Sequence, residues 1–288
     1  MSLDSPLHAA AFRGCINWVL TILKSGENPN NRRVFDNYTP LMVASSRGFS
    51  KIARILLDNG ALVDLVNNYG ASALALAVAM EYVETVKLLI RYGRADVDIA
   101  CSRGWTPLNV AVCKNNINIV NILLNEGANV NITTVYGSSP LFNAVETGYT
   151  EIAKKLVDST ANVNLGTRLG ETPTLVAARK GSVDVLNYLI EADADLNQSS
   201  YSGWNPLLIA SKNNHYECVM KLIQAGADIY KKRMDGQTAY DISISKGHLK
   251  IAKEIKWWRY RGLLLMKTSE NENQKENNEN RKKINHQN

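Results

Sequence analysis

The residue types that most often do chemistry in enzymes are few in this chain and show no catalytic spacing. Among 288 residues there are four histidines and four cysteines, without a Cys-x-x-Cys pair or a metal-ligand spacing with histidine. The chain also lacks a glycine-rich phosphate loop and a Gly-x-Ser-x-Gly motif. A catalytic site needs convergent groups with tuned pKa values. We therefore expect no catalytic residue, no cofactor and no metal, and interpret the protein as a non-enzyme.

The cysteines and possible sugar acceptors have simpler interpretations. Cys15, Cys101, Cys113 and Cys218 are unclustered and fall in helical stretches or loops, which is typical of reduced thiols in a cytosolic protein. The Asn-x-Ser/Thr triplets that begin at Asn37, Asn131 and Asn197 are expected to be turn residues. We expect no signal peptide, because the first repeat begins at Ser5, and no membrane span, because no apolar run is long enough.

The elements that would position any functional residue repeat at a nearly fixed interval of 33 or 34 residues. The repeated theme is Thr/Ser-Pro-Leu followed two residues later by Ala. Its leucine position is filled by Leu7, Leu41, Leu74, Leu108, Leu141, Thr174, Leu207 and Tyr240. Eight copies at one period indicate a repeat architecture, in which each unit buries its apolar face only against the next unit.

One unit, residues 104–136, predicts two helices and a hairpin. Thr106 can cap the first helix, and Pro107 suits its first position because the missing N–H would be unpaired there. Asn115 and Gly127 tolerate the left-handed backbone that ends a helix, so we expect the two helices to stop there. The polar stretch that follows suits a tight hairpin between units.

These units resemble the ankyrin-repeat family. The resemblance lies in "SPLHAA" (5–10), "TPLMVA" (39–44), "TPLNVA" (106–111) and "SPLFNA" (139–144), with "ILLDNGALVD" (55–64) and "ILLNEGANVN" (122–131) in second helices. It covers about residues 5–258, nearly nine-tenths of the chain. It implies an all-α solenoid of stacked helix–turn–helix units with short β-hairpin fingers. We expect residues 1–258 to form this array, with a capping last unit, and 259–288 to be a disordered tail.

The resemblance also implies a binding surface on the concave face, where finger tips and exposed first-helix residues meet. Aromatic and arginine side chains there would form binding hot spots. The candidate residues are Tyr38, Arg47, Tyr69, Arg103, Trp105, Lys114, Tyr136, Arg168, Arg179, Tyr201, Trp204 and Lys212, with Lys180 beside Arg179. Some of these aromatics could instead pack only against neighbouring fingers. The basic lining favours an acidic segment of a partner protein.

Departures from the repeat predict a weak place in the stack. Only His8 keeps the histidine that follows the family's leucine, so a polar network built on that histidine is in doubt elsewhere. Units five and six have Thr160 and Asp193 in place of the glycine that closes the second helix, and Thr174 replaces the core leucine. A β-branched residue at positive φ is strained, and a lost buried leucine costs stability. We predict the least stable junction between units five and six.

Charge is concentrated at the carboxyl end. Residues 256–288 carry eight Lys/Arg and four Asp/Glu, so they supply +4 of the net +6, and the rest of the chain is nearly neutral. Lys256–Lys267, "KWWRYRGLLLMK", is interpreted as the end of the capping helix, with a membrane-surface or partner-helix element as the alternative.

We expect a monomeric, cytoplasmic scaffold or adaptor that binds another protein and no small-molecule substrate, with a nuclear location left open. The alternative is a regulator that contacts nucleic acid or a membrane surface through residues 256–288.

Overall fold

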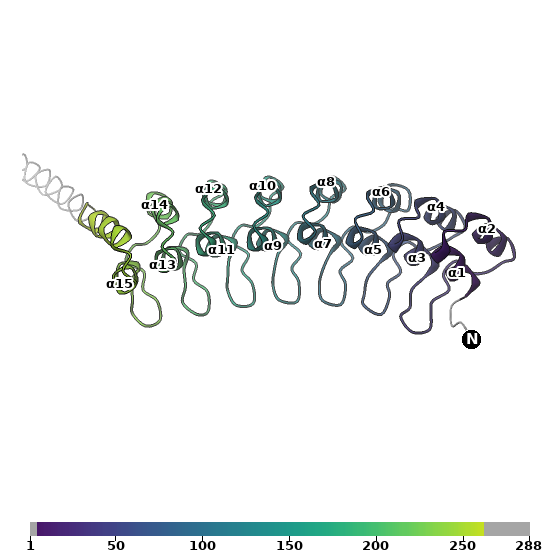
Figure 1. The fold of residues 1–288 in the computed structure, drawn as a ribbon, viewed down its shortest axis with the longest axis horizontal. Helices are drawn as coiled ribbons and strands as arrows, with labels where there is room; N and C mark the ends of the chain where they lie inside the picture. Colours follow the sequence, from purple (N-terminus) through teal and green to yellow (C-terminus); the bar gives the residue numbers. More distant parts are fainter. Residues whose placement is uncertain (1–4, 262–288) are drawn as a thin grey trace, which may run out of the picture.

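The computed structural model describes residues 5–261 as a row of helix pairs in two layers (Figure 1). The inner layer consists of α1 (Pro6–Arg13), α3 (Pro40–Ser46), α5 (Ala73–Ala79), α7 (Pro107–Cys113), α9 (Pro140–Thr147), α11 (Pro173–Lys180), α13 (Pro206–Lys212) and α15 (Ala239–Ser245). The outer layer consists of α2 (Ile16–Lys24), α4 (Ser50–Asp58), α6 (Val83–Arg91), α8 (Ile117–Asn125), α10 (Thr150–Asp158), α12 (Val183–Glu191), α14 (Tyr216–Gln224) and the helical residues 249–261. The expected all-α solenoid is therefore confirmed.

Each inner helix after the first begins at a capping side chain, as the motif predicts. Thr106 Oγ1 accepts a hydrogen bond of 3.2 Å from the backbone N–H of Asn109, and Pro107 is the first residue of α7. The equivalent caps are Thr39, Ser72, Ser139, Thr172, Asn205 and Thr238. A cap of this kind contributes about 1 kcal/mol to helix stability.

The turns after the inner helices have the expected left-handed backbone even where glycine is absent. Asn115 has a φ of 56°, and Glu81 has a φ of 62° at the same position of unit three. After the outer helices, Thr160 and Asp193 have φ values of 64° and 58°, which confirms the strain predicted for these residues. The repeat thus imposes its backbone on residues that do not favour it.

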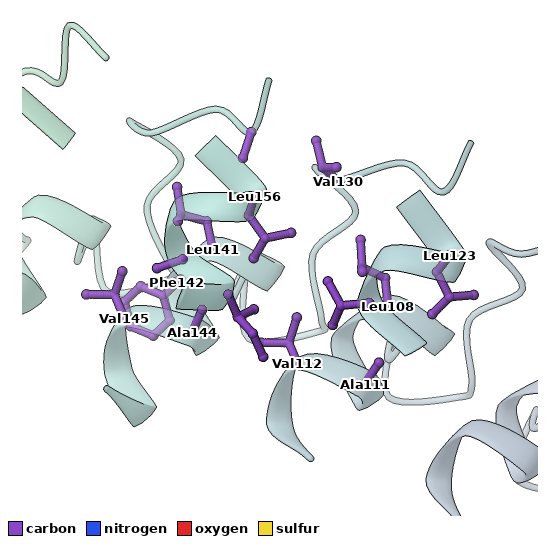
Figure 2. Close-up of a cluster of buried hydrophobic side chains, with 14 of the residues drawn as sticks. Leu108, Ala111, Val112, Leu123, Val130, Leu141, Phe142, Ala144, Val145 and Leu156 are labelled. Carbon is purple, nitrogen blue, oxygen red and sulfur yellow. The ribbon is translucent and has the colours of Figure 1, made fainter. Parts of the chain in front are cut away.

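The core runs through the stack between the helix layers. In Figure 2, Leu108 of α7 and Leu123 of α8 form one group, Leu141 of α9 and Leu156 of α10 form the next, and Val112 of α7 lies between them; all five side chains are buried. The small alanine of each inner helix, such as Ala111 or Ala144, is also fully buried, which lets neighbouring helices approach closely. Each unit is therefore completed by its neighbours, as a solenoid requires.

The fingers that join the units are narrow hairpins with very little strand. In unit four the Cys101 N–H donates to the Trp105 carbonyl at 2.9 Å, and the other fingers repeat this bond. Within residues 5–261 the only β-bridge joins Val66 and Ser72. Five finger tips also donate a backbone hydrogen bond to the tip before them: Asn68 N to Asp36 O, Ser102 N to Tyr69 O, Val135 N to Arg103 O, Arg168 N to Tyr136 O, and Tyr201 N to Leu169 O. This finger ladder fixes the spacing of the tips.

Side-chain amides make a second set of links between units. Asn131 Oδ1 accepts from Asn162 N at 2.8 Å, and Asn197 Oδ1 accepts from Asp228 N at 2.9 Å. Asn37, with a φ of 58°, donates to Asn68 Oδ1 at 2.6 Å. The three Asn-x-Ser/Thr asparagines therefore have turn and linking roles, as expected.

Units five and six carry a further defect at their junction. Thr174, in the core leucine position of α11, is fully buried, and its Oγ1 has no hydrogen-bond partner. A buried hydroxyl without a partner costs about 1–3 kcal/mol. Together with the strained Thr160 and Asp193, this defect supports the prediction that the junction is weak.

The last helical segment covers the end of the core. Ile251 and Ile255 are buried, Trp258 packs against the core, and Lys256 is exposed. The segment continues to residue 261, through the predicted domain boundary after 258. The division into 1–258 and 259–288 stays a prediction, because residues 1–4 and 262–288 lie outside the described residues.

Candidate functional site

The fingers and the exposed sides of the inner helices form one continuous surface, which we call the finger face. Figure 1 shows the row of units as a gentle arch with the fingers on its inner side. Eight of the twelve predicted binding residues lie in the fingers or directly before a helix cap. The other four lie at the carboxyl ends of inner helices: Arg47 and Lys114 are the C-caps of α3 and α7, and Arg179 and Lys212 belong to the last turns of α11 and α13. The period therefore brings these residues to one face.

Three tyrosines project from the finger tips. Tyr69, Tyr136 and Tyr201 are all exposed, Tyr201 by 73%. Their backbone carbonyls or N–H groups take part in the finger ladder. A tyrosine on a fixed backbone loses little conformational entropy on binding, which favours a hot-spot role.

Three other aromatic residues, each just before a helix cap, lie deeper in the face. Tyr38, Trp105 and Trp204 are half-buried between the fingers and the inner helices. Trp204 lies between two cations: the Lys212 Nζ is 4.7 Å and the Arg233 Cζ 4.4 Å from the ring centroid. Burial raises the pKa of the Tyr38 phenol. Because these three side chains are partly buried inside the array, the alternative that some aromatics pack within the protein applies to them in part.

Several exposed apolar side chains at the tips were missed by reasoning from the sequence. Phe35, Leu169 and Met234 are exposed by 74%, 67% and 78%, and they fall on the same repeat positions as Tyr201 or Tyr136. The repeat period that predicts the exposed tyrosines also predicts these apolar residues at equivalent finger positions. An almost continuous row of apolar tips, rather than a set of tyrosines, runs along the fingers.

The predicted cations divide into two groups. Arg103, Arg168, Lys114 and Lys180 are exposed, and none has an ion-pair partner within residues 5–261. These four cations could therefore form ion pairs with carboxylates of a binding partner.

Arg47 and Arg179 already have contacts inside the array. The Arg47 Cζ is 4.5 Å from the centroid of the Phe12 ring. Arg179 donates to Glu146 at 2.8 Å and to Glu171 at 2.6 Å, and it thereby ties unit five to unit six. The structure gives Arg179 a structural role that the sequence did not indicate.

A hollow of about 340 Å³ opens on the finger face between units three and four. Tyr69, Arg103 and Trp105 line it on the side of the fingers, and Ala75, Leu76 and Val110 line it on the side of α5 and α7. The hollow is mainly apolar and contains three of the twelve predicted residues.

A larger hollow of about 570 Å³ lies on the opposite side, among α2, α4 and α6. Its cations are mostly engaged: Arg54 lies 3.6 Å from Asp58, Lys87 lies 2.9 Å from Glu84, and Arg91 lies 2.8 Å from Glu126. Because most of its cations are already paired with carboxylates, its larger volume does not make it the stronger site.

The described histidines make structural hydrogen bonds. His8 is buried between Ser5 Oγ and the Tyr38 carbonyl, each at 2.8 Å. His215 contacts the Arg179 carbonyl at 3.0 Å, and His248 contacts the Ser211 carbonyl at 2.9 Å. Asn109 replaces the missing histidine of unit four, since its amide donates to Thr106 Oγ1 and to the Ile132 carbonyl.

The described part of the chain contains no cluster suited to a metal ion. Among residues 5–261, no three His, Cys, Asp or Glu side chains gather in one place. The same residues include no helix with the length and hydropathy needed to cross a bilayer.

Comparison with known proteins shows what the chain is similar to. The family model described as ankyrin repeats, in three copies, matches residues 7–100, 62–134, 86–167, 141–233 and 175–256. Putative ankyrin repeat protein FPV031 of fowlpox virus (strain NVSL) is 37% identical over 132 residues, which are 45% of this chain and 38% of that protein. The Nuclear factor NF-kappa-B p105 subunit of Gallus gallus is 34% identical over 136 residues, 46% of this chain and 14% of that protein.

One similar protein is an enzyme. Glycerophosphocholine phosphodiesterase gde1 of Schizosaccharomyces pombe is 39% identical over 82 residues, which are 28% of this chain and 7% of that protein. The chain thus aligns with well under half the length of each of these three relatives.

Proposed function

The chain belongs to the ankyrin-repeat family, and on that premise we propose that it is a non-enzymatic scaffold or adaptor that binds another protein through its finger face. Ankyrin repeats are typically interaction modules, which supports a protein as the partner. The observation that carries the proposal is the row of exposed apolar tips, held at fixed spacing by the finger ladder and flanked by cations without internal partners. Preorganisation of this kind lowers the entropic cost of binding.

The charges of the finger face favour an acidic partner segment. Arg103, Lys114 and Arg168 are free of ion pairs within the described chain, whereas Glu146 and Glu171 of the same face are already bound to Arg179. These three charges without ion pairs are therefore all positive. Complementary charge increases the association rate and selects against basic segments.

A cytoplasmic, monomeric adaptor fits these properties best. Cys15, Cys101, Cys113 and Cys218 are all free thiols, which agrees with a reducing compartment. Sedimentation of the purified protein at several concentrations would test the monomer.

The alternative, contact with nucleic acid or membrane through residues 256–288, finds less support in the part described. Arg259 donates to the Ile229 carbonyl and to Thr238 Oγ1, and Arg261 stacks near Trp257 and Trp258. These cations are engaged in closing the array. Deletion of residues 262–288 should therefore leave partner recovery unchanged.

Affinity capture with mass spectrometry tests the proposal. The variant Arg103→Glu with Lys114→Glu reverses two exposed charges of the finger face, and Lys24→Glu with Lys51→Glu makes the same change on the outer helices α2 and α4. We expect the first pair to lose the partners that the wild type recovers and the second pair to keep them.

A second variant tests the apolar tips. Tyr69, Tyr136 and Tyr201 can be changed to serine without opening the core, because all three are exposed. This is safer than truncating Trp204, which packs against the core, or Trp105, which is half-buried. Partner recovery that survives both finger-face variants would show that binding occurs elsewhere.

A further inference from the structure

The hollow between units three and four exists because unit three has alanine where other units have larger side chains. Just before the helix cap, units two, four and seven carry Tyr38, Trp105 and Trp204, whereas unit three carries Ala71. On α5, Ala75 and Ala79 follow at spacings of four residues, which places the three alanines along one side of the helix and its entry. Unit five also has a small residue before its cap, Ser138, but Phe142 and Glu146 follow at the other two positions, so only unit three combines three alanines there.

The bulky neighbour completes the hollow. Trp105 and Val110 of unit four line it together with Leu76 of α5 and Tyr69 at a finger tip. The volume, about 340 Å³, lies just above the lower end of the range for small ligand sites, about 300–1,000 Å³. The hollow is therefore large enough for a bulky side chain and too small for a folded element.

The charged side chain that lines the hollow is a cation, Arg103, and no aspartate or glutamate lines it. At the ends of the inner helices around it, Arg47 follows α3 and Lys114 follows α7. Glu81, just after α5, accepts a hydrogen bond from Asn116 Nδ2. An apolar floor with a cationic rim matches a side chain that is apolar at its tip and has carboxylates beside it in sequence.

We propose that this hollow is an anchor subsite for one bulky aliphatic or aromatic side chain, presented by an acidic, extended segment of a partner protein. The subsite deepens the proposed function and rests on it. The anchor displaces water from Ala71, Ala75 and Trp105, while flanking carboxylates pair with Arg103 and its neighbours. The remaining tips then contribute complementary contacts along the array.

The substitution Ala71→Trp fills the hollow with a side chain that the repeat already accepts. Trp105 and Trp204 occupy the same position in units four and seven, so the variant should keep its fold. Ala75→Met is a second filling variant, since Met42 holds that position in unit two. Ser138→Trp is the matched control, because it adds the same indole at the same position of unit five, away from the hollow.

Selection from a short random-peptide library displayed on phage provides the test. We expect the wild type and Ser138→Trp to enrich peptides with one bulky apolar residue flanked by Asp or Glu, and both filling variants to lose them. With a synthetic peptide of the enriched sequence, Ala71→Trp should weaken binding about 10- to 100-fold, as for the loss of one buried apolar side chain. Alanine at the anchor should weaken wild-type binding by a similar factor.

Other outcomes would overturn the subsite. These are peptides that both filling variants bind unchanged, peptides that are basic or lack an apolar residue, or no enrichment at all. The two proposals fail in different ways. If cellular capture depends on the charge-reversed finger face but not on Ala71→Trp, the subsite is wrong and the adaptor function stands. If capture depends on neither, the adaptor function fails as well.

Discussion

Two buried threonines of α11, two residues apart, should respond to the same substitution with opposite sign. Thr172 is the helix cap, and its hydroxyl accepts a hydrogen bond of 3.2 Å from Leu175 N. Thr174 lies in the core with a hydroxyl that has no hydrogen-bond partner. Valine keeps the branched shape of threonine, so either change removes a hydroxyl without opening a cavity.

The magnitudes follow from these environments. Thr174→Val removes a buried hydroxyl without a partner, and we expect it to stabilise the protein by about 1–2 kcal/mol. Thr172→Val removes a cap and should destabilise by about 1 kcal/mol. Valine suits the extended backbone at Thr172, where φ is −93° and ψ is 160°, so backbone strain does not confuse the comparison.

Urea unfolding followed by circular dichroism measures both effects. With a slope of about 3 kcal/mol per molar urea, the midpoints should move up by about 0.5 M for Thr174→Val and down by about 0.3 M for Thr172→Val. Because repeat arrays can unfold in parts, hydrogen exchange of α10–α12 should be recorded alongside. A midpoint for Thr174→Val at or below the wild-type value would refute the idea that the hydroxyl lacks a partner.

Three further predictions concern single residues. Burial raises the pKa of the Cys218 thiol to about 11. At pH 8 a thiol reagent should therefore modify exposed Cys15 rapidly and Cys218 only after unfolding. Peptide mapping measures both rates of modification, and equal rates would contradict this prediction. Gly137→Ala places its Cβ 2.7 Å from Arg168 N in the finger ladder, whereas the Cβ of Gly127→Ala meets no atom within 4 Å. Both glycines have a positive φ, so thermal denaturation should show a larger decrease in stability for Gly137→Ala than for Gly127→Ala. Hydrogen bonds from Thr238 hold the pKa of Asp241 below its ordinary value, so this carboxylate stabilises the fold above about pH 4 and the stability is lost as pH falls through the lowered pKa. In Asp241→Asn, the free energy of unfolding should therefore fall less steeply as the solution is acidified. An unchanged pH dependence of unfolding would count against the capping box.

Local and periodic features of this fold could be predicted from the sequence, because they depend on one residue and its immediate backbone. The cap at Thr106 and the left-handed turns at Asn115 and Thr160 are examples. The same reasoning located the exposed tips at Tyr69 and Tyr136, since the period alone determines which finger position points outward.

Features that depend on two units together could not be predicted in this way. The pairing of Arg179 with Glu146 and Glu171 joins side chains from adjacent units, and the hollow arises from a small Ala71 next to a large Trp105. The substitution of Asn109 for a histidine in the polar network is of the same kind. Each position looks ordinary in its own repeat, and only the side-by-side comparison of neighbouring copies reveals the property.

The finger ladder has a direction, because in each of its bonds the N–H of one tip donates to the carbonyl of the tip before it. The bond from Arg168 N to Tyr136 O is an example. The backbone bonds of the ladder do not depend on side-chain identity, so the ladder itself would accept the insertion or removal of a whole copy and would lengthen or shorten by one step. Side-chain links between particular neighbours, such as Arg179 with Glu146, would have to be kept or replaced at the new junction. Recognition by this protein can thus be adjusted by duplication and loss of copies, and individual positions can then diverge to suit a target.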